Sequence, residues 1–273
     1  MIRIATCKQL PEPDVDEAPL AAALERAGLA HALVAWDDPT ADWDGAHPTL
    51  LRSTWNYALA LDAFLAWIDR AAAAGPLWNP PSVIRTNVRK RYLLELARRG
   101  VPVIPTTLVE RGEATEPPTE RVVIKPEVGA GSLHTRMFAP GDREAVAHCA
   151  AITATGAALV QPYLASVEDY GERSLVWIDG ELSHAIRKSP RFSGDGEAVT
   201  GPFPIAPEER EVALAALSPV ANEILYGRVD LARDASGQPM VMELELVEPS
   251  LFFAKHPPAA DRFVSALLRK LNT

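Results

Sequence analysis

The sequence predicts a mixed α/β protein in which a small N-terminal unit with a parallel sheet precedes a larger part built on strand hairpins. Two observations predict this class. Strand-like and helix-like segments alternate over the first 75 residues, as is typical of parallel strands joined by crossover helices. Beyond residue 85 the pattern changes to strands joined by short turns, and the segment 228–248 is the clearest of these hairpins.

The N-terminal unit is expected to cover residues 1–85. Its strands and helices are predicted, in chain order, at Ile2–Thr6, Glu17–Ala27, His31–Trp36, Pro48–Ser53 and Leu61–Ala74. Gly28 and Gly75 follow the two helices and act as stop signals. No Gly-x-Gly-x-x-Gly sequence follows the first strand, so a dinucleotide-binding fold is not supported. The segment Asn79-Pro-Pro-Ser82 breaks the alternation and marks the boundary.

Two further segments, 86–164 and 165–273, are expected to form the larger part. In the first we predict a helix at Val88–Arg99, strands around Val103 and at Val122–Lys125, a surface loop at Arg111–Glu120, a helix at Asp142–Thr155 and a strand at Ala158–Tyr163. In the second we predict a hairpin of Arg173–Ile178 with Glu181–Arg187 about Asp179-Gly180, a mobile loop at Ser189–Pro207, and helices at Glu208–Leu225 and Ala259–Leu271.

Composition limits the classes of function. The 273 residues carry a net charge of −9, which argues against a nucleic-acid partner because such proteins present a basic stripe. The two cysteines, Cys7 and Cys149, lack a metal-binding spacing, which indicates a reduced, cytoplasmic chain. Cys7 is a candidate nucleophile, although a small buried residue is the commoner role of a free cysteine. No apolar run reaches membrane length, so no membrane partner is expected.

The hairpin within 228–248 gathers three carboxylates. Glu243 and Glu245 are two residues apart on a predicted strand, so both side chains leave the same face. A turn at Asp234–Gly237 brings Asp230 towards them. Carboxylates at close quarters raise one another's pKa, and a hard cation such as Mg²⁺ relieves this repulsion. The alternative is a solvated acidic face on an edge strand.

Two lysines are candidates for phosphate contacts. Lys125 ends an apolar strand and is followed by a glycine-containing loop with Gly129, Gly131 and Ser132. Glycine lets backbone N–H groups approach an anion, and a lysine supplies a point charge. A plain turn after a strand is the alternative. Lys90 stands at the head of a predicted helix, where a cation opposes the helix dipole unless an anion is bound, and an exposed basic cluster is its alternative.

Other polar residues leave strands near these groups. The run Gln161, Pro162, Tyr163 and Leu164 ends a strand and precedes Glu168, an arrangement that suits an adenine edge and a ribose or else a strand end with a solvated loop. Arg173, Arg187, Lys188 and Arg228 lie on strands expected to converge on the hairpin, where they would bind phosphate or carboxylate or form structural ion pairs. His184 is a candidate acid or base, although a structural role is the simpler reading.

Taken in order, these residues resemble the ATP-grasp superfamily over roughly residues 86–255, and the hairpin resembles that of D-alanine–D-alanine ligases. The resemblance implies an ADP-forming ligase that uses ATP and one or two Mg²⁺ ions. It assigns nucleotide contacts to Lys90, Lys125, the glycine loop and Gln161–Leu164, the ribose contact to Glu168, the metal to Asp230, Glu243 and Glu245, and charge stabilisation during catalysis to Arg228 and Lys125. Those ligases usually carry Asn where this chain has Glu245, which affects the expected charge and geometry of a second metal site.

Several phrases are similar to a narrower branch that includes D-cycloserine synthetase: Arg52-Ser-Thr-Trp-Asn-Tyr57, Asn79-Pro-Pro-Ser82, Gly171-Glu-Arg-Ser174, Ser183-His-Ala-Ile-Arg-Lys188 and Glu248-Pro-Ser-Leu251. This resemblance implies ring closure of O-ureido-D-serine at the expense of ATP. The candidate substrate contacts are Ser53, Thr54, Trp55, Asn56, Tyr57, Arg173, Arg187 and Lys188.

Other functions remain compatible with the sequence. They are a peptide-forming carboxylate–amine ligase acting on another amino acid, an ATP-grasp kinase that stops at a phosphorylated product, and a nucleotide-binding module without catalysis. All of them share a small-molecule ligand. A homo-oligomer is compatible with the resemblance, since related enzymes are often dimers or larger.

Overall fold

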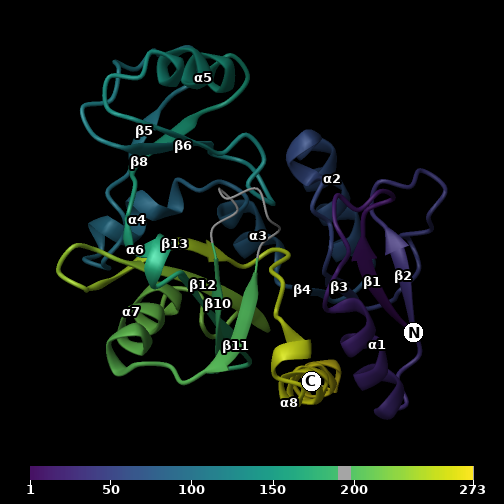
Figure 1. Cartoon of the computed structure of the whole chain (residues 1–273). Helices are drawn as coiled ribbons and strands as arrows, with labels where there is room; N and C mark the ends of the chain where they lie inside the picture. The colour runs from purple at the N-terminus through teal and green to yellow at the C-terminus, as the bar shows by residue number, and fades with distance from the viewer. Residues whose placement is uncertain (190–197, 273) are drawn as a thin grey trace.

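A computed structural model describes residues 1–189 and 198–272. The described chain folds around three β-sheets, which Figure 1 shows as separate layers with helices packed against them. The sheets fall within residues 1–85, 86–164 and 165–273 in turn, while the domain boundaries themselves stay a prediction.

The N-terminal sheet is parallel, as predicted, with strand order β2-β1-β3-β4. Its strands are β1 (Ile2–Thr6), β2 (His31–Ala35), β3 (Thr49–Leu51) and β4 (Leu77–Trp78). The connecting helices are α1 (Glu17–Arg26), the short 3₁₀ helix η1 (Tyr57–Leu59) and α2 (Leu61–Ala74). Strand β4 was not predicted, because two apolar residues between Gly75 and a proline pair give no alternation to detect.

The boundary region differs from the prediction. The proline pair that was expected to break the pattern instead begins α3 (Pro81–Asn87), because a proline at the first helical position loses no hydrogen bond. The predicted helix Val88–Arg99 is confirmed only as the shorter α4 (Tyr92–Arg98). A predicted strand around Val103 is wrong: this residue makes a single bridge to Val241.

The middle sheet is antiparallel, with strand order β5-β8-β6-β7 and helix α5 against it. Its elements are β5 (Thr107–Val109), β6 (Val122–Pro126), β7 (Arg136–Phe138), α5 (Glu144–Thr153) and β8 (Ala158–Pro162). The predicted elements at 122–125, 142–155 and 158–163 are confirmed with small shifts of their ends. The short strands β5 and β7 were missed because three-residue strands carry little pattern.

The C-terminal sheet is also antiparallel, with strand order β11-β10-β9-β12-β13. Its elements and the helices around it are α6 (Ser166–Asp169), β9 (Glu172–Ile178), β10 (Glu181–Lys188), β11 (Val199–Phe203), α7 (Pro207–Leu217), β12 (Tyr226–Arg233), β13 (Pro239–Glu245), η3 (Phe253–Lys255) and α8 (Pro258–Leu271). Both predicted hairpins are confirmed.

Two predictions in this part need correction. The predicted loop Ser189–Pro207 contains β11, and its residues 190–197 lie outside the described residues. The helix predicted at 208–225 ends at Leu217, because Pro219 has no backbone N–H to donate to the preceding turn.

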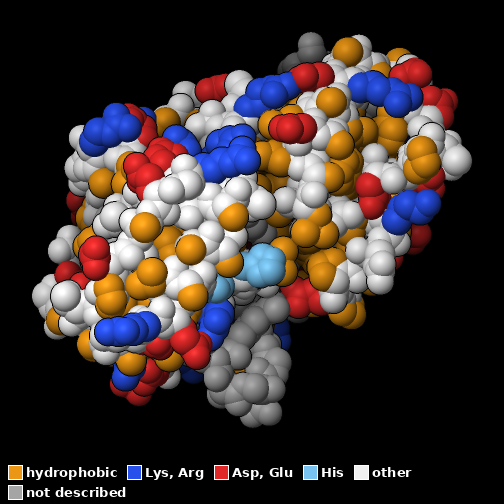
Figure 2. All heavy atoms as spheres, turned by 90° about the horizontal axis from the view of Figure 1, so that it is seen from above, with side chains coloured by type: hydrophobic (Ala, Val, Ile, Leu, Met, Phe, Trp, Pro, Cys, Tyr) orange, Lys and Arg blue, Asp and Glu red, His pale blue; other side chains and the backbone are white. Residues whose placement is uncertain are grey.

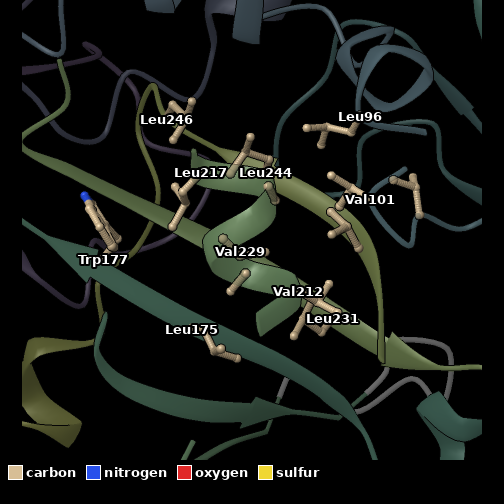
Figure 3. Packing of buried hydrophobic residues seen from close by; sticks show 14 of the residues in the cluster. Leu96, Val101, Leu175, Trp177, Val212, Leu217, Val229, Leu231, Leu244 and Leu246 are labelled. Carbon is tan, nitrogen blue, oxygen red and sulfur yellow. The ribbon is translucent and has the colours of Figure 1, made fainter. Parts of the chain in front are cut away.

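The largest hydrophobic core lies between the C-terminal sheet and α7. Figure 3 shows Val212 and Leu217 of α7 among side chains of β12 and β13, with Leu96 and Val101 on the other side of the same cluster. A second core joins α8 to α1 and to the opposite face of this sheet. The C-terminal helix therefore fastens the N-terminal unit to the sheet that carries the acidic hairpin.

Asn79 is the main polar link between these layers. Its buried amide donates to the carbonyl oxygens of Tyr226 (2.8 Å) and Leu246 (2.7 Å), and its side-chain oxygen accepts from the N–H of Leu225 (2.8 Å). All three partners are backbone groups of the C-terminal sheet region. Because buried backbone groups need partners, the side chain joins the end of the N-terminal unit to the C-terminal sheet.

We expect Asn79→Ala to lower the free energy of unfolding by roughly 2–4 kcal/mol, because it leaves three buried backbone groups without partners. Urea unfolding followed by circular dichroism measures this change. Asn222→Ala, at an exposed position, is the matched control and should change stability by less than about 0.5 kcal/mol. Equal stabilities of the two variants would contradict the linking role.

Candidate active site

The acidic hairpin has the geometry that its sequence predicts. Asp230 on β12 lies opposite Glu243 on β13, and Arg228 lies opposite Glu245. These four side chains therefore share one face of the sheet. Asp230 is 2% exposed, and the side chains of Glu243 and Glu245 are 26% and 28% exposed, so the three carboxylates form a largely buried group and not a solvated acidic face.

Buried carboxylates of this kind need positive partners, and Arg228 is the first of them. Its Nε and Nη2 atoms each lie 2.8 Å from an oxygen of Asp230, which is a bidentate pair, and Nη2 also contacts Glu245. Lys188 on β10 adds a bond of 2.9 Å to Asp230 and an ion pair with Glu172 on β9. Four adjacent strands, β10, β9, β12 and β13, thus contribute to one charged network.

Two lysines from outside this sheet converge on Glu243. Lys90 Nζ, from the turn before α4, lies 2.9 Å from Oε1 of Glu243, and Lys125 Nζ, from β6, lies 3.7 Å from Oε2. Lys90 also donates to the carbonyl oxygen of Gly129 at 2.6 Å. Glu243 therefore links the C-terminal sheet to the middle sheet through its ion pair with Lys125.

The electrostatics of the carboxylates follow from burial and from these cations. Burial opposes ionisation of Asp230, but Arg228 outweighs it and holds the pKa well below its usual range. For Glu245, burial dominates over Arg228 and raises the pKa to about 6. Burial likewise raises the pKa of Glu172 to about 8 in spite of Lys188. An additional positive charge would therefore stabilise the ionised forms of Glu245 and Glu172.

The donor set fits Mg²⁺ in its chemistry. Its buried side-chain oxygens are the ligands that a hard divalent cation takes. Among the described residues, no group of three His, Cys, Asp or Glu side chains is placed around one point. Magnesium does not require such a group, since it commonly binds one or two carboxylates together with substrate phosphates and water.

The glycine loop follows β6, as predicted. Gly131 adopts a positive φ of 58° and is exposed, as is Ser132, while Gly129 is held from below by Lys90. Val128 and Ala130 pack against the hydrophobic cluster of the N-terminal unit. The loop is therefore held by Lys90 at Gly129 and by apolar packing at the residues on either side.

Gln161 and Pro162 end β8, and Tyr163 and Leu164 follow the strand, so these residues have different surroundings. The Gln161 amide is buried and donates to the hydroxyl of Thr106 at 2.9 Å, which is a structural bond. The Tyr163 hydroxyl donates to Glu168 at 2.8 Å, and the Arg121 guanidinium lies over the Tyr163 ring. Glu168 is about half exposed, so its carboxylate is accessible from solvent.

The loop after β3 contacts the chain that follows β13. Trp55 Nε1 donates to the carbonyl oxygen of Glu248 at 3.1 Å, and buried Tyr57 has its pKa raised well above the usual value by burial and then by the charge of Glu248. Ser53 bonds Thr6 within the N-terminal unit. Thr54 is buried, and Asn56 bonds Trp36 and Asp37. Trp55 and Tyr57 are thus the residues of this loop that interact with Glu248, the first through its backbone and the second through its charge.

Arg173 and Arg187 are not brought to the acidic face. They pair with each other across β9 and β10, and each is the sequence neighbour of Glu172 or Lys188. Because successive strand residues point to opposite faces, Arg173 and Arg187 project from the other side of the sheet. Arg173 bonds buried Glu209 of α7 through two 3.2 Å contacts, and both guanidinium groups lie over the ring of Phe203. A structural ion pair therefore accounts for Arg173, and Arg187 packs beside it.

Two acidic residues of the site were missed from the sequence. Glu172 shares its face with Ser174 and Lys188, a period-two signal that the sequence contains. Glu248 appears in a quoted phrase but was given no role, because it lies beyond the end of β13 where strand periodicity stops.

His184 has a structural role. It is 4% exposed on β10, and its Nε2 lies 3.0 Å from the carbonyl oxygen of Leu251. Burial lowers its pKa to about 4, and the neighbouring His256 adds to the shift. Cys7 and Cys149 are both buried, with thiol pKa values raised by burial, which is the small core role and not that of a nucleophile.

Comparison with known proteins agrees with this geometry. A family model described as the N-terminal domain of D-cycloserine synthetase DcsG matches residues 2–79. The chain is 36% identical to the cycloserine biosynthesis protein DcsG of Streptomyces lavendulae over 283 residues, with 95% of each chain covered. The crystal structure of D-cycloserine synthetase DcsG matches with a TM-score of 0.89 and 34% identity, over 99% of both chains. This chain belongs to the DcsG family.

More distant structures show the same fold. D-alanine–D-alanine ligase from Bacillus anthracis, crystallised with ATP, matches with a TM-score of 0.71 and 14% identity over 98% of this chain and 96% of the ligase. The ATP-grasp ligase PsnB, in complex with a minimal precursor, Mg and ADP, matches with a TM-score of 0.62 and 15% identity over 98% of both chains. The DcsG-family chain is therefore an ATP-dependent enzyme of the ligase class with the ATP-grasp fold.

The surface is compatible with a small-molecule enzyme. On the face shown in Figure 2, lysine and arginine side chains are interspersed with aspartate and glutamate and form no continuous basic stripe. No helix among the described residues of this DcsG-family chain is long and apolar enough to cross a membrane.

Because His184 is held neutral in the folded chain, we expect acid to destabilise the protein through it. Its pKa is about 4 when folded and about 6.5 when unfolded, so the contribution is complete above pH 6.5 and is lost as the pH falls towards 4. Between pH 7 and pH 5 the loss should be about 2 kcal/mol. Urea unfolding of wild type and His184→Gln at both pH values measures it, with His31→Gln as control. A pH dependence unchanged in His184→Gln would contradict this account.

Lys188 and Arg187 are adjacent on β10 but point to opposite faces of the sheet, so their variants form a matched pair. Lys188→Met removes a partner of Asp230 and should lower kcat/KM for ATP by about 100-fold or more, as loss of a charge-stabilising donor usually does. Arg187→Met should stay within about threefold of wild type, because its side chain leaves the other face. ADP release measures both. Equal losses would place both side chains in the site.

Proposed function

We propose that this chain closes O-ureido-D-serine to D-cycloserine with consumption of ATP. The observation that carries the proposal is the meeting of Lys90 and Lys125 with the hairpin carboxylates at Glu243. Two buried lysines, one from β6 and one from the turn before α4, and the carboxylates of the C-terminal sheet make a place for both phosphate and its metal ion. The DcsG relative, which the chain matches over nearly its full length, supports the choice of product.

In this proposal separate residues bind the phosphates, bind the nucleoside and stabilise the charge that develops during phosphate transfer. Lys90, Lys125 and the backbone of Gly129, Gly131 and Ser132 hold the phosphates of ATP, while the chain around Tyr163, Leu164 and Glu168 receives the nucleoside. Arg228, already bonded to Asp230 and Glu245, faces the position where charge develops as phosphate passes to the substrate carboxylate. The substrate nitrogen that is bonded to oxygen then attacks the activated carbonyl carbon, and phosphate leaves. Water removes the carbamoyl group from that nitrogen as carbon dioxide and ammonia, which gives D-cycloserine.

Magnesium would be held by Asp230, Glu243 and Glu245 as one or two ions, and when bound it neutralises phosphate charge. Glu245 in place of the usual Asn adds a negative charge at this point. Arg228 offsets that charge within the protein, since its Nη2 contacts Glu245 directly.

The deciding experiment is ADP release with Mg²⁺-ATP and O-ureido-D-serine, with mass detection of the product. ADP together with D-cycloserine establishes the proposed function. ADP formed only with other acid–amine pairs would keep the ligase chemistry and reassign the substrate. ATP binding without ADP under any mixture would contradict catalysis.

We expect Glu243→Gln to lower kcat/KM by at least about 100-fold, because the residue both binds the proposed metal and positions the two lysines. ADP release as a function of Mg²⁺ concentration measures this loss, and far-ultraviolet circular dichroism checks the fold. Glu116→Gln, in the exposed loop, is the control. Activity of Glu243→Gln at the level of this control would rule out the metal assignment.

A further inference from the structure

The chain that follows β13 is held in place at every residue. We name residues 246–251 the strap. Its six consecutive carbonyl oxygens lie within hydrogen-bond distance of side chains from other parts of the fold: Asn79 at Leu246, Tyr226 at Val247, Trp55 at Glu248, Arg52 at Pro249, Arg228 at Ser250 and His184 at Leu251, at distances between 2.7 and 3.1 Å.

A buried ion pair fixes the strap from the N-terminal unit. Asp16, which is fully buried, accepts hydrogen bonds from the N–H groups of Leu251, Phe252 and Phe253, and its other partner is Arg52 at 3.1 Å. The strap backbone is therefore anchored on both its N–H and its C=O groups. A side chain carried by such a backbone has little freedom to move.

Glu248 is the one ionisable side chain on the strap, and it has no ion-pair partner in the described part of the chain. It is 8% exposed, and the charged groups that influence it are Glu245, Lys90 and Glu243. Each neighbouring carboxylate already has its own cation: Glu243 has Lys90 and Lys125, while Glu245 has Arg228. A buried carboxylate without a cation is costly unless a ligand supplies one.

The position of Glu248 indicates which cation that is. The strap continues directly from the metal-binding hairpin, and Trp55 of the loop proposed to contact substrate bonds the carbonyl of Glu248 itself. Phosphates of ATP are anions and would not be attracted to it. The α-ammonium group of an amino acid is a cation that ring closure between the carboxylate and a distal nitrogen leaves untouched.

We propose that Glu248 binds the α-ammonium group of the amino-acid substrate and so determines that the substrate is an amino acid and not a simple carboxylic acid. This inference rests on the proposed function for the identity of the reaction, but the recognition itself requires only that the substrate is an amino acid. An ammonium–carboxylate contact also orients the substrate carboxylate towards Arg228, which binds the strap two residues further on at Ser250.

The test compares two substrates in two proteins. O-ureido-D-serine and its analogue without the amino group are given to wild type and to Glu248→Gln, and kcat/KM is measured by ADP release. Loss of a charged hydrogen bond should cost roughly 10- to 100-fold, so wild type should prefer the amino acid by that factor and the variant should have almost no preference. The KM for ATP and the Mg²⁺ requirement should not change. Glu116→Gln is the control and keeps the wild-type preference.

Each other outcome contradicts the inference. A preference retained in Glu248→Gln overturns it, and a changed Mg²⁺ requirement with the preference intact assigns the residue to the metal instead. If wild type does not turn over O-ureido-D-serine, the proposed function fails separately. The same comparison is then made by calorimetric binding of a panel of D- and L-amino acids in the presence of Mg²⁺-ADP. Wild type that binds none of them, or Glu248→Gln that binds them equally well, overturns the recognition of an ammonium group.

Discussion

The structure depends on the pairing of buried carboxylates with cations that come from separate parts of the chain. Charges removed from water are stable only when they are paired closely. Asp230, Glu243 and Glu245 obtain partners from β10, β12, β6 and the turn before α4. The charged group therefore forms only when the middle and C-terminal sheets are docked, and the same contacts that assemble the fold bring together the groups proposed to bind phosphate and metal.

The N-terminal unit supports the site from the other side. Its Asp16–Arg52 pair and Trp55 bind the strap, and α8 packs on α1, so the unit and the end of the chain hold one segment between them. This arrangement explains why the N-terminal unit and the end of the chain, which are far apart in sequence, pack against each other. A strap with fixed backbone groups presents Glu248 at a defined position, which is what selective recognition of a small substrate requires.

Alternation along strands separates the residues of the acidic group from their sequence neighbours, which pack on the other face of the sheet. Lys188 and Arg187 are neighbours in sequence, yet the first faces the acidic group and the second packs at Phe203. Glu172 and Arg173 divide in the same way. Residue type alone does not distinguish them, because an arginine suits both a phosphate and a structural carboxylate. The register of β9 with β10 makes the choice, and register is a property of the paired strands.

The sequence by itself determined the element types, the parallel N-terminal sheet and the hairpin that aligns Asp230, Glu243 and Glu245, since these follow from local periodicity, turns and helix stop signals. It did not determine the short strands β4, β5 and β7, whose pairing depends on neighbours more than on pattern. Only the tertiary structure decided which cations meet the carboxylates and that Arg173 faces Glu209. The tertiary structure also placed Glu248 on the fixed strap without an ion-pair partner among the described residues. The sequence could not show these features, because the contacts join residues far apart in the chain.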